Sequence, residues 1–207
     1  PGCGGRGADG FRLPVTLDSS ILRELAVGID PSGYLRILDA RYRAAPMGMG
    51  FGRTRFSSQS DSFALLYAAQ DLATALAERI VRDRFQGKTK RVLLESDVDD
   101  LVVASLSARS PLKLLDLRTS GATRLGIPTD AARGRSQLAG RRFSQELYDD
   151  TDFDGIIYMS RITNAECVAV YDRAVTTTLD PACPVVELLR LADLVPALKS
   201  FSIELRR

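Results

Sequence analysis

The sequence predicts an α+β fold, and three observations support this prediction. Strand-like apolar segments are short and numerous, long helical segments are few, and the two kinds do not alternate regularly as they do in a doubly wound sheet. The chain has 207 residues, of which 45% are hydrophobic and 26% charged. This length and composition are sufficient for one domain with a substantial core.

Strands are predicted where apolar side chains alternate with polar ones or form a short continuous run. The first is residues 34–43, which alternate and then enter the glycine-rich loop 46–52. The remaining predicted strands are residues 63–69, 91–94, 101–106, 112–117, 155–159 and 166–171.

The clearest predicted helix spans residues 71–85 and ends before Gly87, a residue type that favours the position just after a helix. One face of this helix is apolar, and Glu78 lies on another face. A short helix is predicted from Asp18 or Ser19 to Leu25, ending near residue 28. Further helices are predicted over residues 137–148 and 185–199, the latter broken near Pro196, whereas residues 124–142 are expected to be partly loop.

Five of the first ten residues are glycine and no periodic pattern is present there, so residues 1–12 are expected to be a disordered linker or a remnant of the expression vector. Residues 13–207 are then expected to form a single domain. No apolar run approaches the roughly 18 residues of a membrane span, so no membrane association is expected.

The sequence contains no histidine, and this absence excludes several kinds of active site. A Ser-His-Asp triad, an HExxH metalloprotease and any metal site that requires imidazole are impossible. Three cysteines (Cys3, Cys167 and Cys183) form no metal-binding spacing, so no metal cofactor is expected, and their odd number fits a reducing compartment. Any catalysis must use carboxylates, arginine, hydroxyls, tyrosine, lysine or cysteine.

Arginine accounts for 24 of the 28 basic residues. This bias could reflect genomic base composition, or some arginines could bind phosphate with two hydrogen bonds each. The net charge of only +2, with acidic residues interspersed among the basic ones, argues against a nucleic-acid binder.

Five polar residues stand out as candidate site residues: Arg43, Arg55, Tyr67, Glu78 and Ser160. Four of them also have an ordinary structural interpretation. Glu78 could form a surface ion pair with the arginine four residues later, Tyr67 could be a core residue, Ser160 could bond to its own backbone, and Arg43 could be a surface arginine. Composition and pattern leave both interpretations open for each of these four.

The order of short motifs around these residues resembles the RES domain family. The motifs are the pair Tyr42-Arg43, the segment RTRF at residues 53–56, the pair Leu66-Tyr67, the segment ALAE at residues 75–78, the segment DGIIYMSR at residues 154–161 and the segment YDR at residues 171–173. The resemblance covers about residues 34 to 175.

This resemblance implies a bent, split β-sheet like that of ADP-ribosyltransferases, flanked by helices and holding NAD in a central cleft. Members of the family resemble toxins that consume NAD and are paired with a helix-turn-helix antitoxin. The resemblance assigns Arg43 and Arg55 to the phosphates of NAD and Tyr67 to the nicotinamide or its ribose. It assigns Glu78 to catalysis and Ser160 to the family's serine, with Arg43 and Ser160 contributing both to binding and to catalysis.

The expected activity is therefore cleavage of the nicotinamide–ribose bond of NAD by hydrolysis or phosphorolysis, a reaction that requires neither metal nor histidine. Transfer of ADP-ribose to a protein from the same site is an alternative, and so is a non-catalytic module that binds a nucleotide or a protein. The resemblance also implies an antitoxin or immunity protein as partner. The expected location is the bacterial cytosol, reached directly or by delivery as part of a longer effector.

Overall fold

The computed structural model describes residues 17–127 and 137–207, and an eight-stranded sheet dominates them. The strands of this sheet lie in the order β1-β6-β7-β8-β3-β2-β5-β9. Strands β4 and β10 form a separate parallel pair. Their bounds are β1 (Ala26–Ile29), β2 (Leu35–Asp39), β3 (Leu65–Ala69), β4 (Val92–Leu94), β5 (Leu101–Ala108), β6 (Leu112–Asp116), β7 (Gly155–Met159), β8 (Glu166–Tyr171), β9 (Leu179–Glu187) and β10 (Glu204–Arg206).

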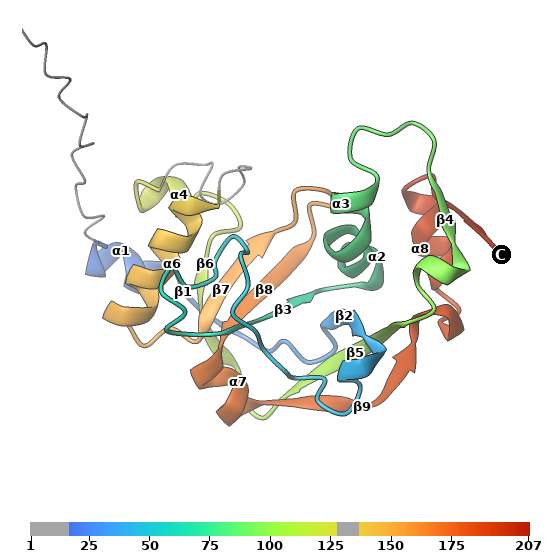
Figure 1. The fold of residues 1–207 in the computed structure, drawn as a ribbon. Coiled ribbons are helices and arrows are strands. Elements are labelled where there is room, and N and C mark those ends of the chain that lie inside the picture. Colours follow the sequence, from blue (N-terminus) through green and yellow to red (C-terminus); the bar gives the residue numbers. More distant parts are fainter. Residues whose placement is uncertain (1–16, 128–136) are drawn as a thin grey trace, which may run out of the picture.

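The helices gather at two ends of this sheet. Helices α1, α4 and α6 lie together at one end, α2, α3 and α8 lie at the other, and α7 lies below the sheet in the view of Figure 1. Their bounds are α1 (Ser19–Glu24), α2 (Leu72–Leu76), α3 (Arg82–Arg84), α4 (Gly121–Arg124), α6 (Leu138–Asp150), α7 (Asp172–Thr178) and α8 (Leu194–Ser200). Among the described residues, no helix combines the length and hydrophobicity needed to cross a bilayer.

The sheet is nearly divided in two between β3 and β2. These neighbouring strands share a single residue pair, Leu35 with Ala69, whereas β3 pairs with β8 and β2 pairs with β5 over five residues each. Because so little backbone pairing joins them, the two parts of the sheet diverge on either side of this pair. The predicted α+β fold with a bent, split sheet flanked by helices is confirmed.

The two faces of the central strands pack into different cores, as the alternation of a strand requires. In β8, Cys167, Ala169 and Tyr171 face the core beneath α1 and α6, while Val168 and Val170 face the core beneath α7. Every one of these side chains is buried. A third core joins α2 and α8 to β5. This two-sided burial explains why β8 reads as a continuous apolar run.

The helix predicted over residues 71–85 begins and ends as expected but is irregular inside. The carboxylate of Asp71 accepts the Thr74 N–H at 2.7 Å and caps the helix, and Gly87 has a φ of +75°, which favours glycine. Between α2 and α3, however, the π-helical turn η2 (Ala77–Val81) widens the helix. No local pattern predicted this turn, which contains Glu78.

Two predicted elements near the start of the chain are shorter than expected. The strand predicted over residues 34–43 ends at Asp39, where its pairing with β5 ends, and continues as the 3₁₀ turn η1 (Ala40–Tyr42). The first helix ends at Glu24 rather than near residue 28, because residues 26–29 pair with β6 as strand β1.

The helix predicted over residues 185–199 is also corrected. Residues up to Glu187 complete β9, an edge strand whose two prolines, Pro181 and Pro184, hid it in the sequence. The chain then forms a 3₁₀ turn (Leu188–Arg190) before α8 starts at Leu194. Pro196 does not break α8, because it is the third residue of the helix and its missing N–H has no intrahelical partner to lose. Residues 1–12 and part of the stretch 124–142 lie outside the described residues.

Gly155, the first residue of β7, supplies a test of this packing. A Cβ at this position would lie 2.2 Å from the backbone oxygen of Ala169 on the neighbouring strand, so the strands would have to separate. We expect Gly155→Ala to lower the free energy of unfolding by about 1–3 kcal/mol, measured by urea denaturation. At Gly50 a Cβ would meet nothing within 4 Å, so Gly50→Ala is the control. Equal stability of the two variants would contradict this register.

Candidate active site

A cavity of about 340 Å³ opens where β2 and β3 diverge. Its size falls within the roughly 300–1,000 Å³ typical of small-molecule pockets. Glu78 is the one carboxylate among the described residues of its lining. Six arginines share the lining with it: Arg36, Arg53, Arg55, Arg79, Arg82 and Arg161. This excess of positive charge favours an anionic ligand.

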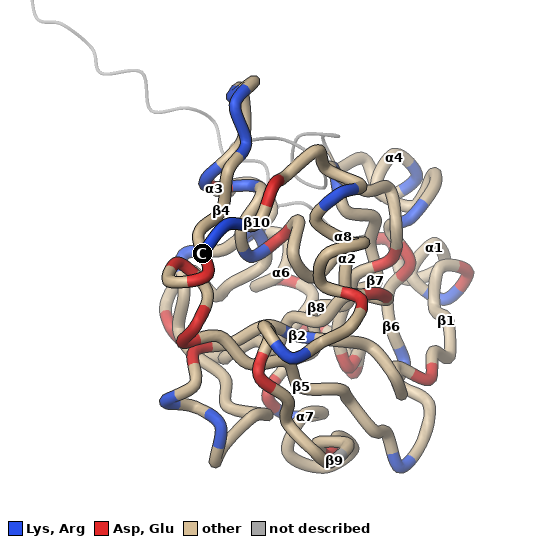
Figure 2. Tube along the Cα trace, turned by 90° about the vertical axis from the view of Figure 1, so that its right-hand side faces the viewer, with Lys and Arg blue, Asp and Glu red and all other residues tan. Residues whose placement is uncertain are grey.

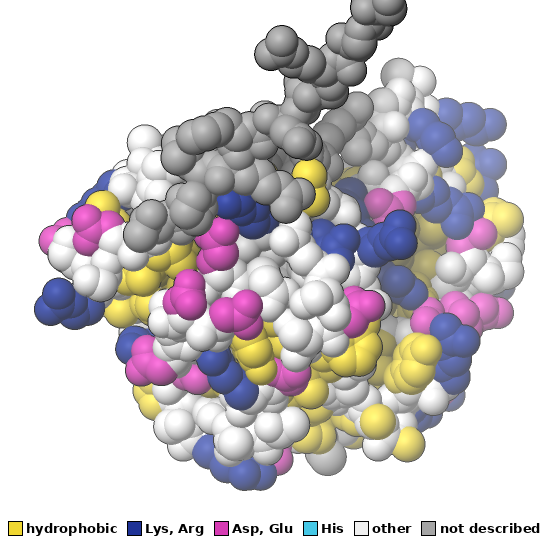
Figure 3. Space-filling view, turned by 60° about the vertical axis from the view of Figure 1, so that its left-hand side comes forward, with side chains coloured by type: hydrophobic (Ala, Val, Ile, Leu, Met, Phe, Trp, Pro, Cys, Tyr) yellow, Lys and Arg dark blue, Asp and Glu magenta, His cyan; other side chains and the backbone are white. Residues whose placement is uncertain are grey.

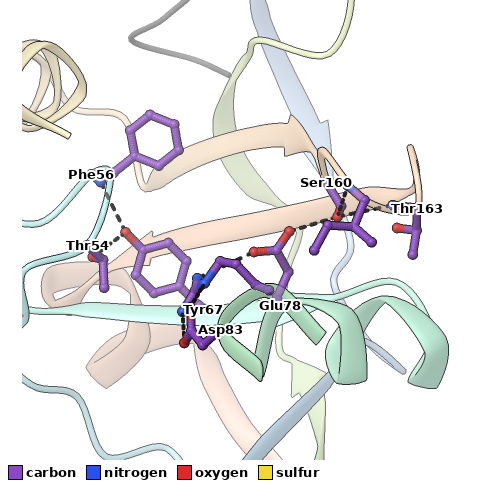
Figure 4. Close-up of polar contacts among 9 residues, drawn as sticks. Thr54, Phe56, Tyr67, Glu78, Asp83, Ser160 and Thr163 are labelled. Carbon is purple, nitrogen blue, oxygen red and sulfur yellow. Dashed lines mark hydrogen bonds and ion pairs between the residues drawn. The ribbon is translucent and has the colours of Figure 1, made fainter. Parts of the chain in front are cut away.

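Glu78 and Ser160 meet at this cavity, although 82 residues separate them in the sequence. The Ser160 hydroxyl donates a hydrogen bond of 2.7 Å to Glu78 Oε1 (Figure 4). Ser160 is 2% exposed and follows the end of β7, whereas the Glu78 side chain is 28% exposed and projects from the helix opposite. The structure therefore brings together two candidate residues that lie in separate sequence motifs.

The surroundings of the Ser160 hydroxyl restrict what it can do. Its oxygen faces the backbone N–H groups of Ile162 at 3.2 Å and, more weakly, of Thr163 at 3.5 Å. A hydroxyl has one proton to donate, and here that proton goes to Glu78. Ser160 thus orients the Glu78 carboxylate.

The second oxygen of Glu78 faces Arg82. Arg82 Nη1 lies 3.6 Å from Glu78 Oε2, so the surface ion pair considered from the sequence is present. It is not the whole environment of Glu78, because Arg82 also makes a closer pair with Asp83 at 2.9 Å and Glu78 also bonds to Ser160. The wide turn η2 carries Glu78, and such turns are frequent at functional sites.

Tyr67 lies in the middle of β3 and lines the cavity. Its hydroxyl shares a hydrogen bond with Thr54 Oγ1 at 2.8 Å and accepts the Phe56 N–H at 3.2 Å (Figure 4). Burial raises the pKa of Tyr67 to about 12, so the phenol stays protonated at neutral pH. Since the hydroxyl holds the loop at residues 54–56, the ring is the part of Tyr67 that remains available to contact a ligand.

Arg55 extends from the same loop into the cavity. Its guanidinium carbon lies 5.9 Å from the centre of the Tyr158 ring, and burial lowers its pKa. Tyr158 is itself buried, and burial raises its pKa. Of the predicted site residues, Arg55, Tyr67 and Glu78 therefore line the cavity, and Ser160 lies behind the lining, where it bonds to Glu78.

Arg43 is the exception among the predicted site residues. It forms an ion pair of 3.2 Å with Glu187 of β9, is about half exposed, and does not line the cavity. The physical reason is that β2 ends at Asp39 and the turn η1 directs the following residues away. The structure does not support placing Arg43 beside the other four.

Arg36, which the sequence analysis overlooked, occupies the cavity wall instead. Its guanidinium donates hydrogen bonds to the carbonyl groups of Pro46 at 2.9 Å and Gly48 at 3.0 Å, so it anchors the glycine-rich loop. Burial lowers its pKa to about 10, which still leaves it charged at neutral pH. Arg36 could have been identified from the sequence as a basic residue within a strand that packs on both faces.

Arg79, Arg82, Tyr158, Arg161 and Cys167 also line the cavity without having been predicted as site residues. Arg79 pairs with Asp39 at 2.7 Å, which connects the helix to the end of β2. The periodicity of the helix could have identified Arg82, since it lies four residues after Glu78. Tyr158 and Cys167 could not be distinguished from core residues, because each stands in an apolar strand.

Charged residues are spread over the described part of the molecule. Basic and acidic residues are interspersed along the described trace, with basic residues on the loop between α3 and β4 (Figure 2). On the face shown in Figure 3, Lys and Arg side chains gather at the upper right.

Within the described ranges, no group of three or more Cys, Asp or Glu side chains could hold a metal ion.

Comparison with known proteins places these residues in a family. The model of the RES domain matches residues 34–189, a range that includes the cavity residues Arg36 to Cys167. The chain belongs to the RES domain family. A protein of Sinorhizobium fredii named "Probable toxin y4kH" is 41% identical over 80 residues, which make up 38% of this chain and 63% of that protein. The chain thus spans less than two thirds of this relative's length.

A solved structure shows the same fold. The match is to the crystal structure of the Mycobacterium tuberculosis MbcT-MbcA toxin-antitoxin complex, with a TM-score of 0.61 and 15% sequence identity. It covers 83% of this chain and 94% of the matched chain. At this identity the likeness concerns the fold, and it extends beyond the RES segment of the chain.

Cys167 provides a chemical test of the cavity floor of this RES domain. Burial raises the pKa of its thiol to about 12, so at about pH 8 only about one molecule in ten thousand carries the reactive thiolate. We expect iodoacetamide to label Cys167 only as fast as the protein unfolds. Peptide mapping by mass spectrometry measures this labelling separately from that of Cys3 and Cys183. Rapid labelling of Cys167 in the folded protein would contradict the described packing.

Proposed function

We propose that this protein is an NAD-consuming toxin that cleaves the nicotinamide–ribose bond. The observation that carries the proposal is the Glu78–Ser160 hydrogen bond at a cavity whose described lining contains six arginines and one carboxylate. Family membership and the similarity to a protein named as a probable toxin support the same assignment.

The arginines would bind the pyrophosphate of NAD. Guanidinium groups can hold phosphate oxygens with two parallel hydrogen bonds, which fixes the orientation of the ligand as well as its charge. Arg55 is the strongest candidate, because it lies on the loop that Tyr67 anchors and is partly desolvated. The Tyr67 ring would then contact the nicotinamide or its ribose, as aromatic faces do with planar ligands.

Glu78 would act on the bond that breaks. When the C1–N bond of the nicotinamide ribose cleaves, the electron pair leaves with nicotinamide, which becomes neutral, and positive charge develops on the ribose carbon and ring oxygen. A carboxylate beside that carbon stabilises this charge, as in glycoside hydrolysis. The attacking nucleophile, if it is water, then bonds to the carbon and loses a proton, which Glu78 could accept.

Ser160 would keep the Glu78 carboxylate aimed during this step. The hydroxyl occupies one lone pair of Oε1, and Oε2 faces Arg82 at 3.6 Å, so the remaining lone pairs of the carboxylate could accept a hydrogen bond from a ribose hydroxyl or the nucleophile. Preorganisation of this kind lowers the barrier because the charged group need not reorient as the reaction proceeds. The site would therefore operate without a metal and without histidine.

The toxin assignment also implies a partner that neutralises the activity. The similar solved structure is the complex of a toxin with its antitoxin. We therefore include an antitoxin or immunity protein in the proposal, together with action in the bacterial cytosol, where NAD is available.

Substitution of Glu78 tests the chemistry directly. We expect Glu78→Gln to reduce the rate of nicotinamide release from NAD by roughly 10²–10⁴-fold, because the amide keeps the shape but loses the negative charge. Nicotinamide is measured by chromatography, with water or phosphate as acceptor. Glu204→Gln is the control, since Glu204 is an exposed carboxylate paired with Arg206. Equal rates for wild type and Glu78→Gln, or no release by wild type with any acceptor, would overturn the proposal.

The reaction products identify the acceptor of ADP-ribose. Hydrolysis yields free ADP-ribose, phosphorolysis yields ADP-ribose 1″-phosphate, and transfer yields a labelled protein. We expect a small-molecule product, because the arginines around the cavity would repel basic side chains of an acceptor protein. Chromatography of radiolabelled NAD products in a cell extract measures the partition. Label found mainly on protein would instead identify an ADP-ribosyltransferase.

A further inference from the structure

A second hydroxyl contact lies one helical turn from the Glu78–Ser160 bond. Thr74 Oγ1 and Thr163 Oγ1 are 2.9 Å apart. Thr74 precedes Glu78 by four residues on the same helix. Thr163 follows Ser160 by three residues in the turn between β7 and β8, and Figure 4 shows these two residues. This turn is therefore attached to the helix at two points.

Thr74 is fully buried, and Thr163 is the one partner of its hydroxyl in the described part of the chain. Its backbone N–H is also engaged, because it donates to the Asp71 carboxylate that caps the helix. Threonine within a helix commonly bonds back to a carbonyl of the preceding turn. Here the Thr74 hydroxyl instead bonds to Thr163 in the β7–β8 turn. A valine has the same shape as threonine but could not form this hydrogen bond.

The β7–β8 turn is compact, so a displacement of Thr163 would also displace Ser160. The Ser160 N–H donates to the Ala165 carbonyl at 2.8 Å, and the Asn164 N–H donates to the Ser160 carbonyl at 3.0 Å. Asn164 adopts a φ of +54°, which closes the turn. The Thr163 N–H also faces the Ser160 hydroxyl. Thr163 and Ser160 thus belong to one closed unit.

Glu78 depends on such an external attachment because its own helix is irregular. The π-helical turn (Ala77–Val81) interrupts the regular α-helical hydrogen bonding around it. The N–H of Ala77 is shared between the carbonyl groups of Ala73 and Thr74. The distance from the helix to the β7–β8 turn therefore sets where the carboxylate lies relative to Ser160.

We infer that Thr74 and Thr163 are a positioning pair that holds the Glu78 carboxylate in its working orientation. The inference rests on the proposed function. Neither hydroxyl acts on the substrate, and their contribution passes through the turn to Ser160 and then to Glu78. Since the orientation of a catalytic group matters most in the transition state, loss of the pair should affect kcat more than KM.

Thr74→Val removes the hydroxyl while keeping the volume of the side chain. We expect kcat for nicotinamide release to fall roughly tenfold to hundredfold, with KM changed less than about threefold. Thr163→Val should give the same loss, the double variant no more than either alone, and Thr74→Ser should restore most of the rate. Amide hydrogen exchange of residues 160–165 should accelerate in Thr74→Val, because the turn is then held at one point only.

Thr177→Val is the matched control, because the Thr177 hydroxyl bonds to a carbonyl of its own helix α7, away from the cavity. Thermal unfolding of all variants separates lost stability from lost positioning. A wild-type kcat in Thr74→Val, failure of Thr74→Ser to restore the rate, or unchanged exchange of residues 160–165 would overturn the inference. If wild type itself releases no nicotinamide, the proposed function fails, while hydrogen exchange still decides whether Thr74 fixes the turn.

Discussion

The hydrogen bond from Ser160 to Glu78 is the contact on which the rest of the site depends. It joins the end of β7, in the more extensively paired part of the sheet, to the irregular helix that covers the divergence of β2 and β3. The surrounding fold holds in place the two elements that this bond joins. Burial on both faces of β7 and β8 fixes the strand ends, and the Asp71 cap fixes the start of the helix.

The absence of histidine limits the reactions that this arrangement could catalyse. A site without imidazole can still cleave a bond whose leaving group departs as a neutral base, provided that positive charge on the ribose is stabilised. In the proposed reaction one carboxylate would suffice for that purpose if its orientation is fixed, and the Ser160 hydroxyl bonds to it here. The arginines of the cavity wall would complement this carboxylate, because they would bind the anionic end of the proposed ligand while Glu78 would stabilise its developing cation.

The sequence predicted those parts of the fold that a local pattern specifies. The apolar runs predicted β7 and β8, and the apolar face and Gly87 predicted the helix around Glu78 and its end. Edge strand β9 was missed because an edge tolerates prolines that a central strand does not. The π-helical turn had no local signal in the sequence. Arg36 stands as a basic residue within a strand, but that it lines the cavity and Arg43 does not depends on where β2 ends. The order of motifs identified Arg55, Tyr67, Glu78 and Ser160 as candidates, but the hydrogen bond between Glu78 and Ser160 joins residues far apart in the sequence and could not be predicted from a local pattern.

In the proposed function, Ser160 contributes to catalysis through Glu78 and not independently. A double-mutant cycle on nicotinamide release tests this claim most directly, with Glu78→Gln, Ser160→Ala and the combined variant compared with wild type. If Ser160 acts by holding the carboxylate, the combined variant should be about as slow as Glu78→Gln alone, because removing the orienting hydroxyl has no further effect once the charge is lost. Losses that multiply, so that the combined variant is slower by the product of the two single effects, would contradict the claim.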